Sequence, residues 1–288
     1  MGEHYSSRVT ERQSAGVRSE AASGMERDAG RRRRASRWAR VRLLLPALAL
    51  IVAIGPMPTL GVRAAGVDDV EMIEIPTGWF VMGSAEADAD QDEQPVARIF
   101  VDGFWIDKHE VTNRRYQRCV DAGVCVVPIG SELGDRGRAD HPVAILSWRQ
   151  ATDYCRWAGK RLPSEAEWEK AARGPDGRRY PWGDAFEPER ANAGYTLGLG
   201  PVGEHSSGAS PYGVLDMAGS AWEWTSSLYR PYPYDATDGR EDPSAHGARV
   251  NRGGSWYYRA WYVRTTYRAT ADQGYRRVRD LGARCARS

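Results

Sequence analysis

Residues 141–174 have the sequence HPVAILSWRQATDYCRWAGKRLPSEAEWEKAARG, which predicts two consecutive helices. In the first half, apolar residues recur at mixed helical spacing over Trp148–Trp157, and Gly159 follows where a helix would end. In the second half, Ser164 and Glu167 stand three residues apart and match a capping box. These two helices account for little of the chain.

The flanking sequence predicts strands and loops. Residues 73–84, IEIPTGWFVMGS, alternate around Pro76-Thr77-Gly78 and predict a hairpin. Residues 97–112, ARIFVDGFWIDKHEVT, predict one or two further strands with a break at Gly103. After residue 174, short alternating runs such as AWEWTS stand among loops rich in Gly, Pro, Trp and Tyr. The pattern predicts a mixed α+β fold with little regular secondary structure.

An arginine-rich region and a short apolar run precede this domain. The apolar run Leu43–Ile54 is shorter than the roughly 20 residues that a membrane-spanning helix needs. Followed by small residues, it resembles a secretory signal cleaved near Ala64 or Ala65, with translation starting at Met1 or Met25. An uncleaved membrane anchor and a disordered basic tail are the alternatives. We therefore expect residues 1–65 to be a leader and the protein to be exported, to the periplasm, the envelope or the exterior.

Charge separates the two parts of the chain and limits the partners. Residues 1–65 hold 12 of the 40 basic residues but 5 of the 38 acidic ones, so the remainder carries 28 basic and 33 acidic residues. A net-acidic domain argues against nucleic acid as a partner. Contact with a membrane is expected only through the leader, if it stays uncleaved.

Four cysteines are a candidate disulfide set in an oxidising compartment. Three pairings are possible. Cys119 and Cys125 stand six apart in CVDAGVC, where Gly123 permits a reversal, so a local bridge is the simplest pairing and leaves Cys155 with Cys285. No pair has CxxC spacing and the five histidines are scattered, so we expect no zinc site.

Seven fragments, in order and spacing, resemble the formylglycine-generating enzyme family, also called the sulfatase-modifying factor family. They are IPTGWFVMGS (75–84), DEQPVARIFVDGFWIDKHEVTNRRY (92–116), residues 141–174, YPWGD (180–184), GVLDMAGSAWEWTSS (213–227), VNRGGSW (250–256) and LGARCAR (281–287). Each fragment alone is weak, whereas the ordered set is specific. The resemblance implies an irregular, disulfide-tied variant of the C-type-lectin fold over residues 66–288, with the positions of Cys155 and Cys285 bonded.

The resemblance also implies a chemistry that this chain lacks the residues to perform. Family members with the founding activity oxidise a cysteine in a CxPxR peptide to formylglycine with copper(I) and oxygen. They need two thiolates shortly after the GGS motif, because soft sulfur ligands select Cu(I). At those positions this chain has Tyr258 and Val263. We expect no catalytic residue there, no bound copper and no formylglycine production.

Structural calcium is a separate implication of the resemblance, because hard oxygen donors in one turn suit this ion. The first family site is matched by Asp216, Gly219, Ala221 and Glu223. A second, weaker set begins at Asn192 and Ala193, but its later acidic ligand has no counterpart. The alternative for the first set is a buried strand with Trp222 and Trp224 on one face and Glu223 in solvent.

Aromatic and arginine residues crowd the segment after the GGS motif, as they do at binding hot spots. The candidate binding residues are Tyr257, Tyr258, Arg259, Trp261, Tyr262 and Arg264. The alternative is that about half of the aromatics, Trp256 among them, belong to the core. We expect a peptide, glycan or protein ligand that the sequence does not identify.

The sequence and the resemblance together suggest three alternative functions. The first is an exported, non-catalytic binding or scaffold domain, the second an oxidoreductase of the same family with altered chemistry, and the third an envelope-anchored structural component. Other chemistry finds little support, because phosphate-loop and hydrolase motifs are absent and His109 and His141 are isolated from any catalytic grouping.

Overall fold

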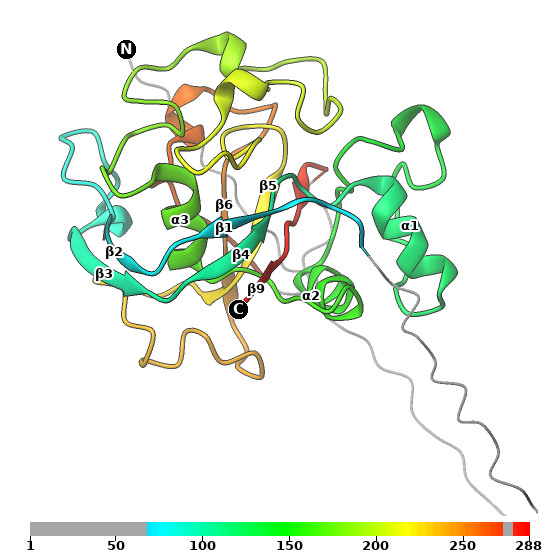
Figure 1. The fold of residues 1–288 in the computed structure, drawn as a ribbon, viewed down its shortest axis with the longest axis horizontal. Coiled ribbons are helices and arrows are strands. Elements are labelled where there is room, and N and C mark those ends of the chain that lie inside the picture. Colours follow the sequence, from blue (N-terminus) through cyan, green and yellow to red (C-terminus); the bar gives the residue numbers. More distant parts are fainter. Residues whose placement is uncertain (1–67, 273–278) are drawn as a thin grey trace, which may run out of the picture. The chain divides into compact units, whose positions relative to one another are not determined.

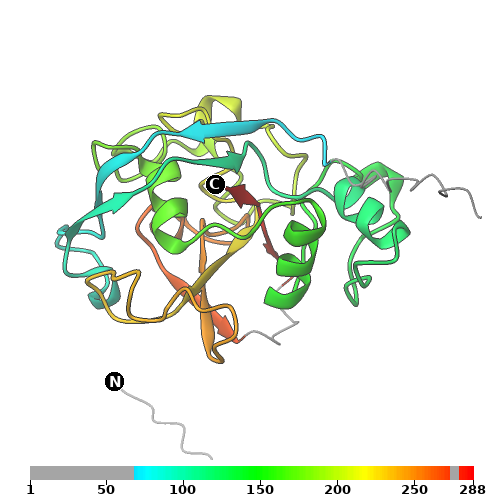
Figure 2. The same cartoon turned by 60° about the horizontal axis from the view of Figure 1, so that its bottom comes forward.

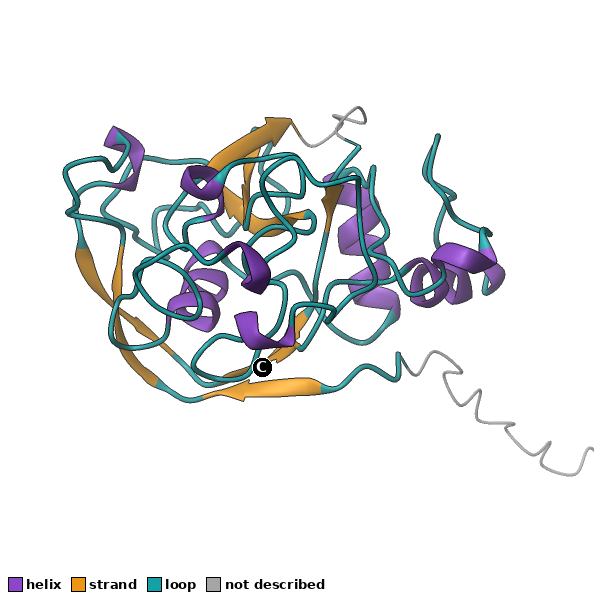
Figure 3. Ribbon diagram, turned by 90° about the horizontal axis from the view of Figure 1, so that it is seen from above, coloured by secondary structure: helices purple, strands orange, loops and turns teal. Residues whose placement is uncertain are grey.

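The computed structural model describes residues 68–272 and 279–288, which belong to one compact unit spanning Leu60–Ser288 (Figure 1). The predicted leader, residues 1–65, lies outside the described residues. Short strands and helices are joined by long loops (Figure 3), which confirms the irregular α+β fold. Within the described ranges, no helix has the length and hydropathy needed to cross a membrane.

The described residues form three α-helices and nine strands. The helices are α1 (Asn113–Asp121), α2 (Trp148–Trp157) and α3 (Glu165–Arg173). The strands are β1 (Met72–Ile75), β2 (Gly78–Met82), β3 (Ala97–Val101), β4 (Phe104–Asp107), β5 (Trp222–Leu228), β6 (Ala248–Arg252), β7 (Ala269–Asp272), β8 (Leu281–Gly282) and β9 (Ala286–Arg287). The helices predicted within residues 141–174 are α2 and α3, and both are confirmed.

Side-chain caps fix where these two helices begin. Ser147 Oγ accepts from the backbone N–H of Gln150 at 3.2 Å at the start of α2. Ser164 Oγ accepts from Glu167 N at 3.1 Å at the start of α3, and the Glu167 carboxylate returns to Ser164 N at 2.8 Å. Both are capping boxes, which satisfy N–H groups that the first helical turn leaves unpaired. Gly174 follows α3 with φ 71°, a conformation that glycine adopts easily.

The predicted hairpin of residues 73–84 is wrong. β1 pairs with β4 and β2 pairs with β3, all antiparallel, so β1–β2 and β3–β4 run side by side as one kinked ribbon (Figure 1). The two breaks face each other, since Gly103 N donates to Thr77 Oγ1 at 2.7 Å. Lys170 Nζ of α3 holds the kink from inside by donating to the carbonyls of Pro76 at 2.6 Å and Gly78 at 3.1 Å. Each strand therefore has a distant partner and needs no reversal at Pro76.

The C-terminal residues join two sheets. One sheet has the order β1-β4-β9, and the other has the order β7-β6-β5-β8, in which β5 and β8 are parallel. β8 and β9 are only three residues apart, so the end of the chain links the N-terminal ribbon to the sheet that carries the GGS motif. Figure 2 shows this last segment, in red, running beside α2.

Both disulfides have the pairing that the sequence favours. Cys119 is bonded to Cys125, and Cys155 of α2 is bonded to Cys285 between β8 and β9. The second bond spans 130 residues and fixes the C-terminal segment against α2. All four cysteines of the chain are therefore oxidised, and none is free.

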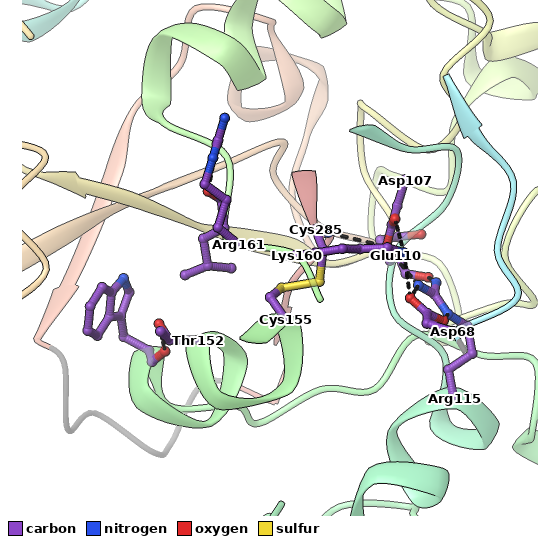
Figure 4. The surroundings of a disulfide bond; sticks show 11 residues. Asp68, Asp107, Glu110, Arg115, Thr152, Cys155, Lys160, Arg161 and Cys285 are labelled. Carbon is purple, nitrogen blue, oxygen red and sulfur yellow. Dashed lines mark hydrogen bonds and ion pairs between the residues drawn. A yellow bond between two sulfur atoms is a disulfide. The ribbon is translucent and has the colours of Figure 1, made fainter. Parts of the chain in front are cut away.

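A buried ion cluster lies beside the longer disulfide (Figure 4). Asp68 accepts from Arg115 Nε at 2.5 Å and from Lys160 Nζ at 2.6 Å, and Asp107 accepts from the same two side chains at 2.7 Å. Burial alone would raise the pKa of Asp68, but the hydrogen bonds and charges of Arg115 and Lys160 hold it below its usual value. The cluster ties the start of the described chain to α1 and to the end of α2.

Arginines of the C-terminal third are paired with carboxylates in the interior. The fully buried pairs are Glu93–Arg264, Glu165–Arg268, Glu169–Arg252 and Glu223–Arg284. Two of the carboxylates come from α3 and one from β5, so the pairs connect elements far apart in sequence. Burying one such charge alone is costly, whereas a paired and hydrogen-bonded charge is tolerated.

Candidate binding site

The Gly253-Gly254 turn positions the segment predicted to bind a ligand. Gly254 has φ 71°, and a Cβ atom there would lie 2.5 Å from Val263 Cγ1. Glycine thus lets the short 3-10 helix Ala260–Val263 approach the turn closely. After the turn, the Ser255 hydroxyl donates to Asp280, which fixes the segment to the residues just before β8.

Aromatic rings from this segment gather against one ring of β5. The aromatic cluster comprises Trp222, Tyr257, Tyr258, Trp261, Tyr262 and Tyr267. Neighbouring ring centroids lie 5.1–5.9 Å apart, mostly in tilted or edge-to-face arrangements. Rings in these geometries attract one another beyond the burial of their area.

A cleft of about 440 Å³, here the aromatic cleft, opens between this cluster and β7. Its lining consists of Trp222, Asn251, Tyr258, Tyr267, Ala269, Thr270, Ala271, Asp272 and Leu281. Among these described residues Asp272 is the sole charged one. The lining mixes aromatic and small apolar side chains with polar groups that could orient a ligand.

The tyrosines of the cleft are neutral phenols. Burial, followed by the negative charge of Asp280, raises the pKa of Tyr258 above its ordinary value. Burial, followed by the charge of Asp90, raises that of Tyr267. Neither phenol is therefore a base at neutral pH, and both can donate hydrogen bonds. The arrangement suits contact with a ligand better than proton abstraction.

Five of the six predicted binding residues reach the surface. Tyr257 is 53% exposed and Arg259 is exposed, while Tyr258, Trp261 and Tyr262 are half-buried. The expectation for Arg264 as a surface contact is wrong. Its guanidinium is fully buried and bound to both Glu93 oxygens, at 2.7 and 3.0 Å.

A larger cleft of about 680 Å³ is one that the sequence analysis missed. Its walls come from the loop between α1 and α2, from residues 197–199, and from Trp256 and Arg279. Trp256, assigned to the core as an alternative, is half-buried and lines this cleft. Ile129 and Leu197 stand exposed at its walls. Loops carry most of this lining, so no periodic pattern in the sequence marks it.

The two positions aligned with the family's copper ligands differ in access. Tyr258 lies in the aromatic cleft, with its ring centroid 5.4 Å from that of Trp222. Val263 is fully buried and packs with Tyr180 and with small side chains of the core. The second position is therefore occupied by a core side chain.

The predicted calcium ligands lie on one curled stretch of backbone. Asp216 and Ser220 have φ 59° and Gly219 has φ 81°, conformations that non-glycine residues seldom adopt. Asp216 Oδ2 accepts from Gly203 N at 2.7 Å. Glu223 does not point to solvent as the alternative required: it is fully buried, and Arg284 binds both of its oxygens, at 2.6 and 2.7 Å.

Glu110, which the sequence analysis did not consider, lies at the same place. It is fully buried, Oε1 accepts from Ala221 N at 3.2 Å, and Oε2 has no hydrogen-bond partner among the described residues. Burial, then the charges of Asp216 and Glu223, raise the pKa of Glu110. Arg284 neutralises Glu223, so Asp216 and Glu110 are the acidic groups left at this turn, and they favour a cation. In residues 68–272 and 279–288, however, no three His, Cys, Asp or Glu side chains could hold a metal by themselves, so backbone oxygens would have to take part.

The weaker calcium set is engaged in local hydrogen bonds. Asn192 Nδ2 donates to Gly198 O at 3.0 Å, and its side-chain oxygen accepts from Thr196 at 2.5 Å. Its backbone oxygen accepts from Ser220 N at 2.8 Å, and Ala193 is buried. These contacts connect the loop after residue 192 to the 216–220 turn.

Comparison with known proteins supports one family. Residues 61–288 match the model of the sulfatase-modifying factor enzyme 1-like domain. The chain is 30% identical to the mouse formylglycine-generating enzyme, over 75% of this chain and 74% of that protein. It is 32% identical to the mouse inactive C-alpha-formylglycine-generating enzyme 2, over 74% and 82%, and 32% identical to the Streptomyces coelicolor formylglycine-generating enzyme, over 74% and 88%.

Solved structures of similar fold are more distant in sequence. PvdO from Pseudomonas aeruginosa superposes with a TM-score of 0.63 at 24% identity, covering 76% of this chain and 94% of that one. The Treponema denticola variable protein 1 superposes with a TM-score of 0.62 at 21% identity, covering 75% and 94%. These likenesses show a common fold.

Proposed function

The chain belongs to the sulfatase-modifying factor family, and we propose that it is an exported member that binds a ligand without oxidising cysteine. The ligand site comprises the aromatic cleft and the exposed residues beside it, Tyr257 and Arg259. A peptide, a glycan or a protein surface are the candidate ligand classes.

The observation that carries the proposal is the state of the cysteines. All four are in disulfides, so the chain offers no thiolate to copper(I). Tyr258 and Val263 occupy the positions that the resemblance assigns to the copper ligands. A neutral phenol and a buried isopropyl group cannot replace two thiolates, and Val263 packs among core side chains that offer no metal ligand.

Two further features support binding and export. The rings that line the aromatic cleft are held by buried Arg–Glu pairs and by the Gly254 turn, so the surface is preorganised, which lowers the cost of ordering it on binding. The two disulfides suit an oxidising compartment. This favours the expected export, whose signal lies outside the described residues.

Anaerobic titration with Cu(I) tests the absence of the founding chemistry. With a CxPxR peptide present, we expect no stoichiometric copper binding at sub-micromolar concentration and, after oxygen is admitted, no aldehyde in the peptide. The Streptomyces coelicolor relative, assayed in parallel, is the positive control. Aldehyde formation by this protein, at a rate comparable to that control, would contradict the proposal.

We propose a structural role for calcium at the 216–223 turn. Asp216, a Glu223 oxygen shared with Arg284, and the backbone oxygens of Gly219 and Ala221 would hold the ion, and the unpaired Glu110 oxygen is a further oxygen donor beside them. Bound calcium would supply a positive charge that stiffens this turn and would take no part in any reaction.

A thermal melt tests this site. Calcium at 100 times its dissociation constant is expected to stabilise the fold by about 2.7 kcal/mol, and Asp216→Ala should abolish the response. Glu74→Gln, at an exposed carboxylate on β1, is the matched control and should respond as the unaltered protein does. A melting temperature that calcium leaves unchanged relative to magnesium at equal ionic strength would refute the assignment.

A further inference from the structure

Three aromatic rings line the aromatic cleft as one contiguous group, in which Trp222 is buried and Tyr258 and Tyr267 are half-buried. Trp222 meets Tyr258 at a centroid distance of 5.4 Å and an interplanar angle of 78°, and it meets Tyr267 at 5.9 Å and 46°. The rings are thus steeply inclined to one another. Each aromatic face carries partial negative charge, so inclined rings around one cavity favour a positive guest.

The charges at the cleft have the same sign. Asp272, at the end of β7, lines it together with the Asn251 amide, and no basic side chain does so among the described residues. Asp272 has no ion pair in the part of the chain that the structure describes, so its charge is available to a ligand. Two further aspartates act from outside the lining. Burial is the largest cause of the raised pKa of Tyr258, and the negative charge of Asp280 is the second. For Tyr267 the largest cause is again burial, and the second is the negative charge of Asp90.

One cation approaches the cleft from the interior. The Arg264 guanidinium lies 6.0 Å from the Tyr267 ring centroid. It is neutralised by Glu93, with which it forms two hydrogen bonds in the core. It therefore does not offset Asp272 at the open side. The exposed Arg259 contacts a different ring, that of Tyr195, at 5.5 Å, and does not line the cleft.

We propose that the aromatic cleft binds an alkylammonium cation, with Trp222, Tyr258 and Tyr267 as its walls and Asp272 as its counter-ion. This rests on the proposed binding function and names its ligand class. A cavity of about 440 Å³ has room for a methylated ammonium group and part of the chain that bears it. An anion would meet Asp272 with no basic partner, and a neutral sugar would leave that charge unused.

Calorimetric titration of the mature, disulfide-bonded protein tests the inference. The probes are choline and its uncharged isostere, in which a quaternary carbon replaces the nitrogen. We expect choline to bind at least about tenfold more tightly than the isostere, a difference of about 1.4 kcal/mol. A peptide that carries a trimethylated lysine, titrated in a second arm, shows whether the cation can be a side chain. Equal affinities for choline and the isostere, or no binding of either at tens of millimolar, would overturn the proposal.

Matched variants locate the site. Asp272→Asn should weaken choline binding several-fold, whereas Glu74→Gln, on β1 and absent from the cleft lining, should leave it unchanged. Tyr258→Phe keeps the ring and should retain binding, while Tyr258→Leu removes the aromatic face and should lose most of it. Unchanged binding in both Asp272→Asn and Tyr258→Leu would place the ligand elsewhere.

The proposed ligand class and the proposed non-catalytic function can be refuted independently of each other. Equal binding of choline and its isostere refutes the ligand class but leaves a non-catalytic binding domain standing. Copper-dependent aldehyde formation refutes that function whatever choline does. Because the comparison of choline with its isostere is made on the unaltered protein, misfolding of a variant does not affect it.

Discussion

Replacing both Cys155 and Cys285 by alanine is expected to destabilise the domain by about 5 kcal/mol. The chain-entropy model predicts a loss of this size, because the bond closes a loop of 130 residues and its removal frees the unfolded chain. Alanine is the suitable replacement, since both side chains are fully buried and a serine hydroxyl would be left without a partner. Denaturant unfolding followed by fluorescence measures the loss.

The second disulfide is the internal control. Cys119 and Cys125 are six residues apart, so the same model predicts a loss of about 2 kcal/mol when both become alanine. Losses of equal size in the two double variants would show that loop length is not what sets the contribution. A small loss at Cys155 and Cys285 would mean that the sheet and the Asp68 ion cluster hold the C-terminus without the bond.

Local signals account for the parts of the fold that the sequence predicted. The caps at Ser147 and Ser164 act within three residues, so the sequence contains the whole interaction. The strands at residues 97–101 and 104–107 could also be predicted from the sequence, because Gly103 divides an apolar run. Cysteine spacing similarly favoured the pairing that the structure confirms.

Pairings between distant segments account for the errors. Nothing within residues 73–84 shows that β1 and β2 each have a partner at least 15 residues later, so a proline and a glycine between them looked like a turn. α1 was not predicted because its sequence, NRRYQRCVD, is mostly polar, and the apolar residues that it packs on the core are few: Tyr116, Cys119 and the partly buried Val120. Its Thr112 cap is a weak signal when so few apolar residues follow it.

In the candidate site, too, local features could be predicted from the sequence and contacts between distant segments could not. The aromatic residues after the GGS motif were evident, but their division between surface and core depends on partners far away. The larger cleft brings together segments of which some are more than 50 residues apart, and Glu110 approaches the 216–223 turn from the loop between β4 and α1. Arg264 was assigned to the binding surface because arginine and aromatic residues crowd this segment, as they do at binding hot spots. Glu93, 171 residues earlier, is what makes its burial possible.

Replacing Arg264 by methionine is expected to cost about 3–5 kcal/mol of stability, because it leaves the Glu93 carboxylate buried without its cation. Thr266 Oγ1 would remain as a donor to Glu93 at 2.6 Å, which does not compensate a full charge. The guanidinium also lies 4.7 Å from the Trp261 ring centroid, so its loss should loosen the aromatic cluster. Denaturant unfolding measures the effect, and near-ultraviolet circular dichroism reports on the cluster.

Arg259→Met is the matched control, since this arginine is five residues earlier, exposed, and without a carboxylate partner among the described residues. Its stability should change by no more than about 0.5 kcal/mol. Adding Glu93→Gln to Arg264→Met should recover much of the loss, because no unpaired charge then remains in the core. If Arg264→Met were as stable as Arg259→Met, the Glu93 pair would not hold this segment, and Arg264 would again be a candidate for ligand contact. If the single variant is destabilised and the double variant recovers, Arg264 shapes the binding surface from beneath, through its pair with Glu93.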